Sequence, residues 1–458
     1  MKPKSSVIDP QDDLFKVRLV DLINPDHALC RLANQLDWSL LEREISGYFS
    51  VAGAPGLPVR LMAGLLYLQH AFNVSDERVV EQWVESPYWQ YFCGETFFQH
   101  QLPCDPTSLI RWRQRLGEEG CEWLLTATIQ AGLSTRLVKP ASLKRIVLDT
   151  TVQEKNIAFP TDSKLYDTSR KQLVKLAASL GITLRQTYQK QARLLLPKIG
   201  RYGHARQFKR MRKAIKQIKG ALGRVYRDLK RQLPVVVVLN ESQQTQLDHA
   251  ARLLAQKKRS KNKLYSLHAP EAECISKGKA HKRYEFGVKA SFATTLRETF
   301  VVGARSFTGN PYDGHTLTEQ LEQTEILCNT AATEVYVDRG YRGHRHPGDA
   351  KVILAGQQRG VSPQQKKRLR RRNTIEPIIG HMKQDGKLRR CFLKGALGDA
   401  MNVILCGAGQ NIRKLLKWLS WALLLVLSGL SIRLLLAHLP RLVKGTRYSC
   451  FNLLEKAA

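Results

Sequence analysis

Apolar residues recur every three or four positions through residues 1–136, and this spacing predicts an all-helical N-terminal domain. One helix is expected over residues 57–72 and a second over residues 77–84, with a break and a Ser cap at Ser75 between them. This pair has the layout of a helix-turn-helix, although a plain helical bundle produces the same pattern.

A capped start at Asp105 predicts a further helix in this region. Arg111 and Arg115 are four positions apart, so they share one face of that helix. A helix that faces DNA and a helix whose cations are merely solvated both fit the pattern.

From residue 140 onward the pattern changes to short apolar or alternating runs, which predict strands. A helix is expected over residues 317–328, and strands are expected over residues 144–152, 282–291, 299–304, 334–338 and 351–355. Paired strands followed by strand–helix units indicate an α/β core with a mixed sheet over residues 140–415. A helical C-terminal tail is expected over residues 416–458.

A long, mostly helical segment at about residues 156–265 interrupts this core and is very basic. It holds 26 Lys and Arg against 5 Asp and Glu. A solvated helix would explain such a run, but this density of one sign favours contact with nucleic acid. One face nevertheless packs, because apolar residues keep a helical stripe at Ile215, Ile218, Leu222, Val225 and Leu229.

The composition of the whole chain points the same way. Its 458 residues carry a formal net charge of +34 and a pI near 10.0, which indicates a polyanionic partner, nucleic acid ahead of an anionic membrane surface. The nine Cys residues form no C-x-x-C pair, which indicates reduced thiols in the cytosol rather than disulfides or a zinc finger.

Two segments bear on the membrane. The first twenty residues are charged, so no signal peptide is predicted. The apolar run at residues 418–440 is interrupted by Arg433, which favours a helix that is buried or packed against a partner; a membrane span is the alternative.

A single carboxylate stands in the most basic part of the core. Glu376 is the only acidic residue between positions 351 and 384, a stretch that holds nine Lys and Arg. The residues before it fit a capping box, so a helix is expected to begin there, with Arg372 outside the helix and not an i, i+4 partner. Lys383 follows two helical turns later and shares the face of Glu376. This pattern fits two roles for Glu376, a residue of the helix cap and a metal ligand.

Two more acids are isolated in similar surroundings. Asp149 lies within an apolar strand run, where a carboxylate is costly to bury unless it is paired or bound to a metal. Asp338 ends the predicted strand 334–338 and precedes Arg339, so it could also be a turn residue. Together with Glu376 these acids suit a pair of divalent metal ions that act on a phosphodiester.

At these residues the chain resembles the DDE transposases of bacterial insertion sequences, in the insertion-sequence-five group. The resemblance covers about residues 20–415. Its core pieces are residues 147–151 around Asp149, residues 336–343 around Asp338, and a spacing of Arg372, Glu376 and Lys383 that matches the signature Y-x2-R-x3-E-x6-K. Residues 277–289 and 309–315 also look like this family. Leu369 stands at the position of the signature Tyr.

The resemblance implies an RNase H-like catalytic core interrupted by the basic segment, and an N-terminal domain that recognises the ends of the element. It implies a transposase in which Asp149, Asp338 and Glu376 hold two Mg²⁺, for which Mn²⁺ can substitute. Phosphate contacts are expected from Arg372 and Lys383, and more weakly from Arg339 and Arg342.

The implied partners are the terminal repeats of the element and target DNA, with at least a dimer in the active complex in the bacterial cytosol or nucleoid. Two alternatives remain at this stage. One is a decayed transposase that only occupies element ends, and the other is an RNase H-like nuclease that does not join strands.

Overall fold

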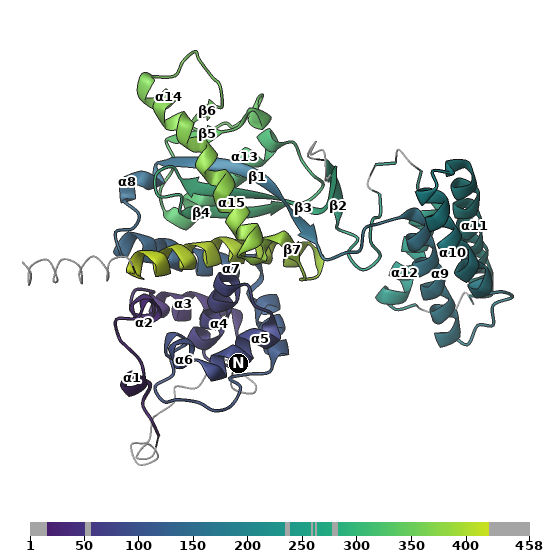
Figure 1. The fold of residues 1–458 in the computed structure, drawn as a ribbon, viewed down its shortest axis with the longest axis horizontal. Coiled ribbons are helices and arrows are strands. Elements are labelled where there is room, and N and C mark those ends of the chain that lie inside the picture. The colour runs from purple at the N-terminus through teal and green to yellow at the C-terminus, as the bar shows by residue number, and fades with distance from the viewer. Residues whose placement is uncertain are drawn as a thin grey trace, which may run out of the picture.

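The computed structural model describes residues 16–50, 56–233, 239–257, 260–261, 263–276 and 283–420 (Figure 1). Its N-terminal part is helical: α1 (Leu19–Leu22), α2 (Ala28–Ala33), α3 (Trp38–Ile45), α4 (Val59–Phe72), α5 (Asp76–Glu85), α6 (Pro87–Phe92) and α7 (Pro106–Ser134). Helix α4 is the centre of this group, since nearly all its side chains are buried.

The predicted break between two helices is confirmed. Asn73 ends α4 in the left-handed conformation, with φ of 56°, and the side chain of Ser75 accepts a hydrogen bond from the backbone N–H of Arg78 at the start of α5. Asp105 caps α7 in the same manner, as its carboxylate accepts from the N–H of Thr107. These caps satisfy N–H groups that a helix start leaves without partners.

The described strands form one mixed sheet in the order β2-β3-β1-β5-β6, with β4 also on β3 and β7 also on β1. β1 is antiparallel to β3 and parallel to β5, which is in turn parallel to β6. The expected strands are therefore confirmed as β1 (Arg145–Lys155), β3 (Tyr284–Thr295), β4 (Val301–Phe307), β5 (Glu334–Val337) and β6 (Lys351–Leu354), and β2 (Glu273–Ser276) and β7 (Arg390–Cys391) are added.

Shorter helices and one long helix surround the sheet. Helix α13 (Asp313–Cys328) connects β4 to β5 and packs on β4. The shorter helices of this part are α8 (Pro140–Leu143), α14 (Pro363–Leu369), α15 (Ile375–Gln384) and the 3-10 helices η3 (Arg339–Tyr341), η4 (Arg370–Thr374) and η5 (Lys387–Arg389). A further 3-10 helix, η2 (Ser46–Tyr48), belongs to the N-terminal part, where it contacts α3 and α7.

The helix at residues 395–420 runs between the N-terminal helices and the sheet (Figure 1). The amide of Asn411 accepts from the backbone N–H of Val301 and donates to its carbonyl, so it pairs with β4 much as a neighbouring strand would. The same amide donates to Thr128 of α7 at 3.0 Å. One continuous hydrophobic core therefore joins the N-terminal helices, this helix and the sheet.

The basic segment between β1 and β2 forms a separate helical bundle beside the sheet (Figure 1). A second hydrophobic core holds it together, with Leu173, Ile218 and Leu253 among its buried residues. Its helices are α9 (Asp162–Ser179), α10 (Gln189–His204), α11 (Phe208–Gln232) and α12 (Glu241–Ala255).

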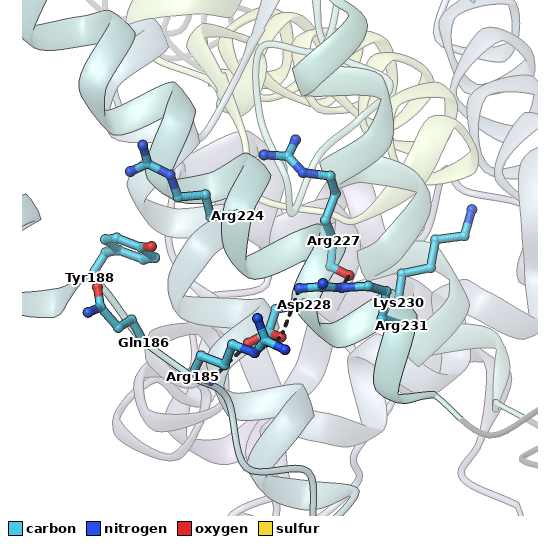
Figure 2. A pocket seen from close by; sticks show the side chains of 8 residues that line it. All are labelled: Arg185, Gln186, Tyr188, Arg224, Arg227, Asp228, Lys230 and Arg231. Atoms are coloured by element: carbon cyan, nitrogen blue, oxygen red, sulfur yellow. Dashed lines mark hydrogen bonds and ion pairs between the residues drawn. The ribbon is translucent and has the colours of Figure 1, made fainter.

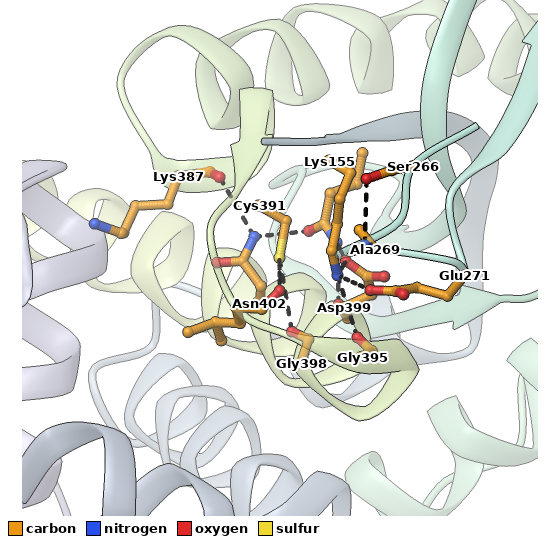
Figure 3. Close-up of polar contacts among 12 residues, drawn as sticks. Lys155, Ser266, Ala269, Glu271, Lys387, Cys391, Gly395, Gly398, Asp399 and Asn402 are labelled. Carbon is orange, nitrogen blue, oxygen red and sulfur yellow. Dashed lines mark hydrogen bonds and ion pairs between the residues drawn. The ribbon is translucent and has the colours of Figure 1, made fainter. Parts of the chain in front are cut away.

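A buried polar network fixes the place where the chain leaves the sheet for this bundle and returns from it (Figure 3). The amine of Lys155 at the end of β1 pairs with Glu271 at 2.6 Å and with Asp399 at 3.0 Å. Asn402 on the same helix as Asp399 donates to Gln153 at 2.7 Å. A buried amine needs such partners, because an uncompensated buried charge is costly.

The start of the Glu376 helix differs from the expectation. No side chain caps α15 at Thr374, so the predicted capping box does not form. Instead the 3-10 helix η4 runs directly into α15, which leaves no free helix start to cap. Arg372 consequently lies one turn before Glu376 and forms an i, i+4 ion pair with it, so the expectation that Arg372 is no such partner is wrong.

Most of the apolar run at residues 418–440 lies outside the described residues. Across the part of the chain that the structure describes, no helix is both long enough and apolar enough to span a membrane. The cysteines of that part are all free thiols.

Candidate active site

Asp149 and Asp338 lie at equivalent positions on neighbouring parallel strands. The register of β1 and β5 pairs Val147 with Tyr336, and each aspartate follows its partner by two residues. Side chains two positions apart point to the same face of a strand, and neighbouring strands run about 4.8 Å apart. The sheet therefore brings both carboxylates to one face, with Asp149 inside β1 and Asp338 directly after the end of β5.

Both aspartates are half-buried and each is oriented by the backbone that follows it. The carboxylate of Asp149 accepts a hydrogen bond from the N–H of Thr150 at 2.8 Å. That of Asp338 accepts from the N–H of Gly340 at 2.9 Å and caps η3. The turn-forming role considered for Asp338 is thus present alongside its position at the strand end.

Glu376 reaches the same place from helix α15. One cavity of about 820 Å³ is lined by Asp149, Asp338 and Glu376 together. In this structure the side chain of Glu376 is 56% exposed and pairs with Arg372, whose side chain is only 10% exposed. The carboxylate is therefore the partner with room to turn, while the guanidinium is held by its surroundings.

A fourth carboxylate, which the sequence pattern did not single out, lines this cavity. Asp313 at the start of α13 accepts from the hydroxyl of Thr150 at 2.9 Å and from the amine of Lys289 at 2.8 Å. Its segment, residues 309–315, is rich in turn residues, among which an Asp attracts no notice. The available signal was the likeness of residues 309–315 to the transposase family, because Asp313 lies in that segment, in the first turn of α13.

A buried phenol and a glycine show how closely three of these acids approach one another. Burial raises the pKa of Tyr341 well above its usual value, and the charges of Asp149, Asp313 and Asp338 raise it further. A Cβ at Gly340 would lie 2.8 Å from Oδ2 of Asp313 and 3.0 Å from Oδ1 of Asp338. Only a glycine permits both carboxylates this close to the backbone.

The donor chemistry of the cavity suits a hard divalent cation, because carboxylate oxygens are the ligands that Mg²⁺ and Mn²⁺ prefer. Among the described residues, however, no three His, Cys, Asp or Glu side chains are arranged to hold a metal ion together. Asp149 and Asp338 are positioned as a pair, and Glu376 would complete the set only after it leaves Arg372.

The cations expected near the site are distributed unevenly. Arg372 contacts the cavity through Glu376, whereas Lys383 lies half-buried two turns further along α15. Arg339 turns to the end of β6, where its Nε donates to the carbonyl of Ala355 at 3.4 Å. Arg342 is exposed, and its carbonyl accepts from the hydroxyl of Tyr312, which lines the cavity.

The two arginines expected on the N-terminal domain are both exposed on α7. The guanidinium of Arg115 lies 5.8 Å from the ring centre of Phe49. Arg113, on another face, is buried and pairs with Asp76 of α5. Arg111 and Arg115 thus remain available to a partner, while Arg113 links two helices of the domain.

Two segments of the chain match domains of known proteins. Residues 17–115 match a transposase domain (DUF772), and residues 350–416 match a transposase DDE domain. The second segment contains Arg372, Glu376 and Lys383, whereas Asp149 and Asp338 lie outside both segments.

A curated relative from Rhizobium meliloti, described as an uncharacterized protein of the nfe locus (ORF8), is 48% identical over 198 residues, which is 43% of this chain and 96% of that protein. No solved structure matches the chain. With a transposase domain at its N-terminal end, a transposase DDE domain around the third carboxylate, and a sheet that brings two aspartates to the same cavity, the chain belongs to the DDE transposases of insertion sequences.

Proposed function

We propose that this transposase cuts DNA at the ends of its own insertion sequence and joins the freed ends to target DNA in an Mg²⁺-dependent reaction. The observation that carries the proposal is the single cavity lined by Asp149 from β1, Asp338 from the end of β5 and Glu376 from α15. Three carboxylates converge there from distant parts of a chain that is otherwise strongly cationic.

Asp149, Asp338 and Glu376 are the residues that would hold two Mg²⁺. A metal pair supplies charge stabilisation to the attacking and leaving oxygens of an in-line displacement. Water is the first nucleophile: it attacks the phosphodiester, and the broken bond leaves a 3′-hydroxyl on the element. That hydroxyl then attacks a phosphodiester of the target, whose own 3′ oxygen leaves, so no covalent enzyme intermediate is required.

Arg372 and Glu376 would change partners in this reaction. Glu376 has the exposed side chain of the pair, so it is the residue that turns toward Asp149 and Asp338. Arg372 then presents a guanidinium whose planar fork suits a phosphate oxygen pair near the scissile bond. Lys383 is the second candidate for that contact, with Arg339 and Arg342 more peripheral.

The other parts of the chain take the roles that the resemblance implies. Residues 140–415 would be an RNase H-like core, and residues 1–136 would bind the element ends, with Arg111 and Arg115 toward DNA. Two ends must be brought together, so the active complex would contain at least two copies. The signature Tyr of the insertion-sequence-five family is replaced by Leu369, which packs against the main core.

The test uses a supercoiled plasmid that carries the gene with its native flanks. Purified protein is added with Mg²⁺ or with EDTA, alongside Asp149→Ala and Glu376→Gln variants, and nicks and joined products are mapped to the base. Metal-dependent nicks at two matching inverted flanks, absent from both variants, are expected. Full joining activity in Glu376→Gln would refute the site, scattered nicks would indicate a nuclease, and binding without cleavage would indicate a decayed end-binding protein.

A further inference from the structure

A second cavity lies on the basic bundle, where the loop before α10 rests against α11 (Figure 2). Its volume is about 660 Å³. It shares no lining residue with the cavity that Asp149, Asp338 and Glu376 line, which we call the carboxylate cavity. The residues that line it are Arg185, Gln186, Tyr188, Arg224, Arg227, Asp228, Lys230 and Arg231.

Buried charged groups hold this loop in place. Arg170, which is 2% exposed, pairs with Asp167 on α9 and donates to the carbonyl of Thr187 at 2.7 Å. From the other side the carboxylate of Asp228 accepts from the backbone N–H of Arg185 at 2.8 Å. Because buried charges are stable only with such partners, the loop is fixed on α11 rather than loosely laid over it.

The fixed loop and α11 together concentrate positive charge. The lining holds the five cations Arg185, Arg224, Arg227, Lys230 and Arg231 against one carboxylate, that of Asp228. The hydrogen bond from the Arg185 backbone keeps the pKa of Asp228 below its usual value, so this acid stays ionised. It is buried beneath the cations as the acceptor for the loop, and four positive charges are left without compensation.

The spacing of these cations follows one face of α11. Arg224, Arg227 and Arg231 are three and four positions apart, so they form a row along the helix. The row spans about 10.5 Å, which is the axial distance covered by about three phosphates of one DNA strand. At one end Arg224 lies 5.5 Å from the ring centre of Tyr188, which closes the groove with an aromatic face (Figure 2).

We propose that this groove, which we call the α11 groove, binds the sugar–phosphate backbone of duplex DNA outside the catalytic cavity. The inference rests on the proposed function for the choice of DNA as the polyanion. An extended ligand fits better than a small anion, since the side chains of Arg185 and Arg231 are 80% and 62% exposed. Toward the start of α11 the same face carries the exposed residues Lys209, Lys213 and Lys216 at spacings of three and four positions.

The test measures how the affinity for a labelled duplex carrying an element end depends on salt. The plot of log K against log salt has a slope of about −0.9 for each phosphate that a cation neutralises. Arg224→Gln/Arg227→Gln should therefore reduce the steepness of the slope by about 1.8, and Arg224→Lys/Arg227→Lys should restore it. The matched control is Lys164→Gln/Lys175→Gln, which removes the same charge from exposed positions of α9 and should leave the slope unchanged.

A second measurement uses the unaltered protein, so it does not depend on the folding of a variant. Acetylation with acetic anhydride, followed by mass spectrometry, should show Lys230 protected by the duplex while Lys164 and Lys175 stay reactive. An unchanged slope in the α11 variant, an equal loss in the control, or a reactive Lys230 in the complex would each overturn the proposal. If the same slope measurement on duplex RNA showed the change and the DNA duplex did not, that result would overturn the proposal as well.

The two proposals fail separately. A protein that shows the slope change but no metal-dependent cleavage would retain the α11 groove and lose the proposed chemistry. A protein that cleaves both flanks while the α11 variant keeps its full slope would retain the chemistry and lose the groove.

Discussion

Replacing Gly340 with Ala should impair DNA cleavage far more than it impairs folding. Gly340 follows the strand that carries Asp338, and its N–H donates to that carboxylate. An added Cβ would lie 2.8 Å from Oδ2 of Asp313 and 3.0 Å from Oδ1 of Asp338. Both acids line the carboxylate cavity, so the added methyl group acts on the site directly.

The size of the effect follows from these two distances. Ordinary contact with a Cβ begins at 3.4 Å, so Asp313 must retreat from 2.8 to 3.4 Å, about 0.6 Å, and Asp338 from 3.0 to 3.4 Å, about 0.4 Å. Asp313 cannot move freely, because Thr150 and Lys289 hold it at 2.9 and 2.8 Å. Since misplacement by about 1 Å can cost about 100-fold in rate, a loss of about 10- to 100-fold is expected.

The assay is the rate of Mg²⁺-dependent nicking at the element ends, measured together with urea unfolding of the same preparation. Gly200→Ala is the control, because a Cβ there meets nothing within 4 Å and the residue is exposed inside α10. It should keep its nicking rate and gain about 0.5–1 kcal/mol of unfolding free energy. A Gly340→Ala protein that nicks at the unaltered rate would refute the view that Asp313 and Asp338 act at one site.

Three further outcomes are expected. Arg113→Ala should lower the unfolding free energy measured in urea by about 3–5 kcal/mol, because it leaves the carboxylate of Asp76 without its cation in a partly buried position. Burial raises the pKa of Asp76, but the hydrogen bond and charge of Arg113 outweigh this effect and lower that pKa. The stabilisation should therefore be lost as the pH falls below about 4, and Asp76→Asn should remove this pH dependence. Burial lowers the pKa of Lys414 to about 8, so the unfolded chain binds more protons above that pH and the unfolding free energy should gain a rising contribution from pH 8 toward 10 that is absent from Lys414→Met. Arg111→Gln/Arg115→Gln should reduce the steepness of the salt dependence of end binding by about 1.8, and an unchanged slope would place the end contacts elsewhere.

The hydrophobic pattern was sufficient for most elements, because each of them buries one stripe or one face. The break at Asn73 and the cap at Ser75, the strand around Asp149 and the hairpin of β3 and β4 all follow from local residue types. The role of Asn411 does not, since its amide serves as a partner for the edge strand β4 only when a helix from the far end of the chain lies against it. Such a contact has no local signature.

Some residues of the carboxylate cavity could likewise be predicted from the sequence and others could not. Asp149 was singled out because an acid in an apolar strand breaks a local rule, and the register of β1 and β5 then places Asp338 beside it. Asp313 was missed because an Asp in a turn-rich segment breaks no rule, although its partners Thr150 and Lys289 come from two different strands. Tertiary pairing of this kind is visible only after the sheet has been assembled.

Arg372 and Asp338 show why a local structural role is weak evidence against a chemical one. The pattern before Glu376 favoured a capping box, yet η4 runs into α15 and the neighbouring arginine takes the carboxylate instead. Asp338 does cap η3, and the same geometry directs it toward the cavity because the capped turn follows the strand end directly. A backbone N–H that orients a carboxylate also fixes where its second oxygen points. In this chain the cap role of Asp338 and its place in the cavity therefore come from the same strand end.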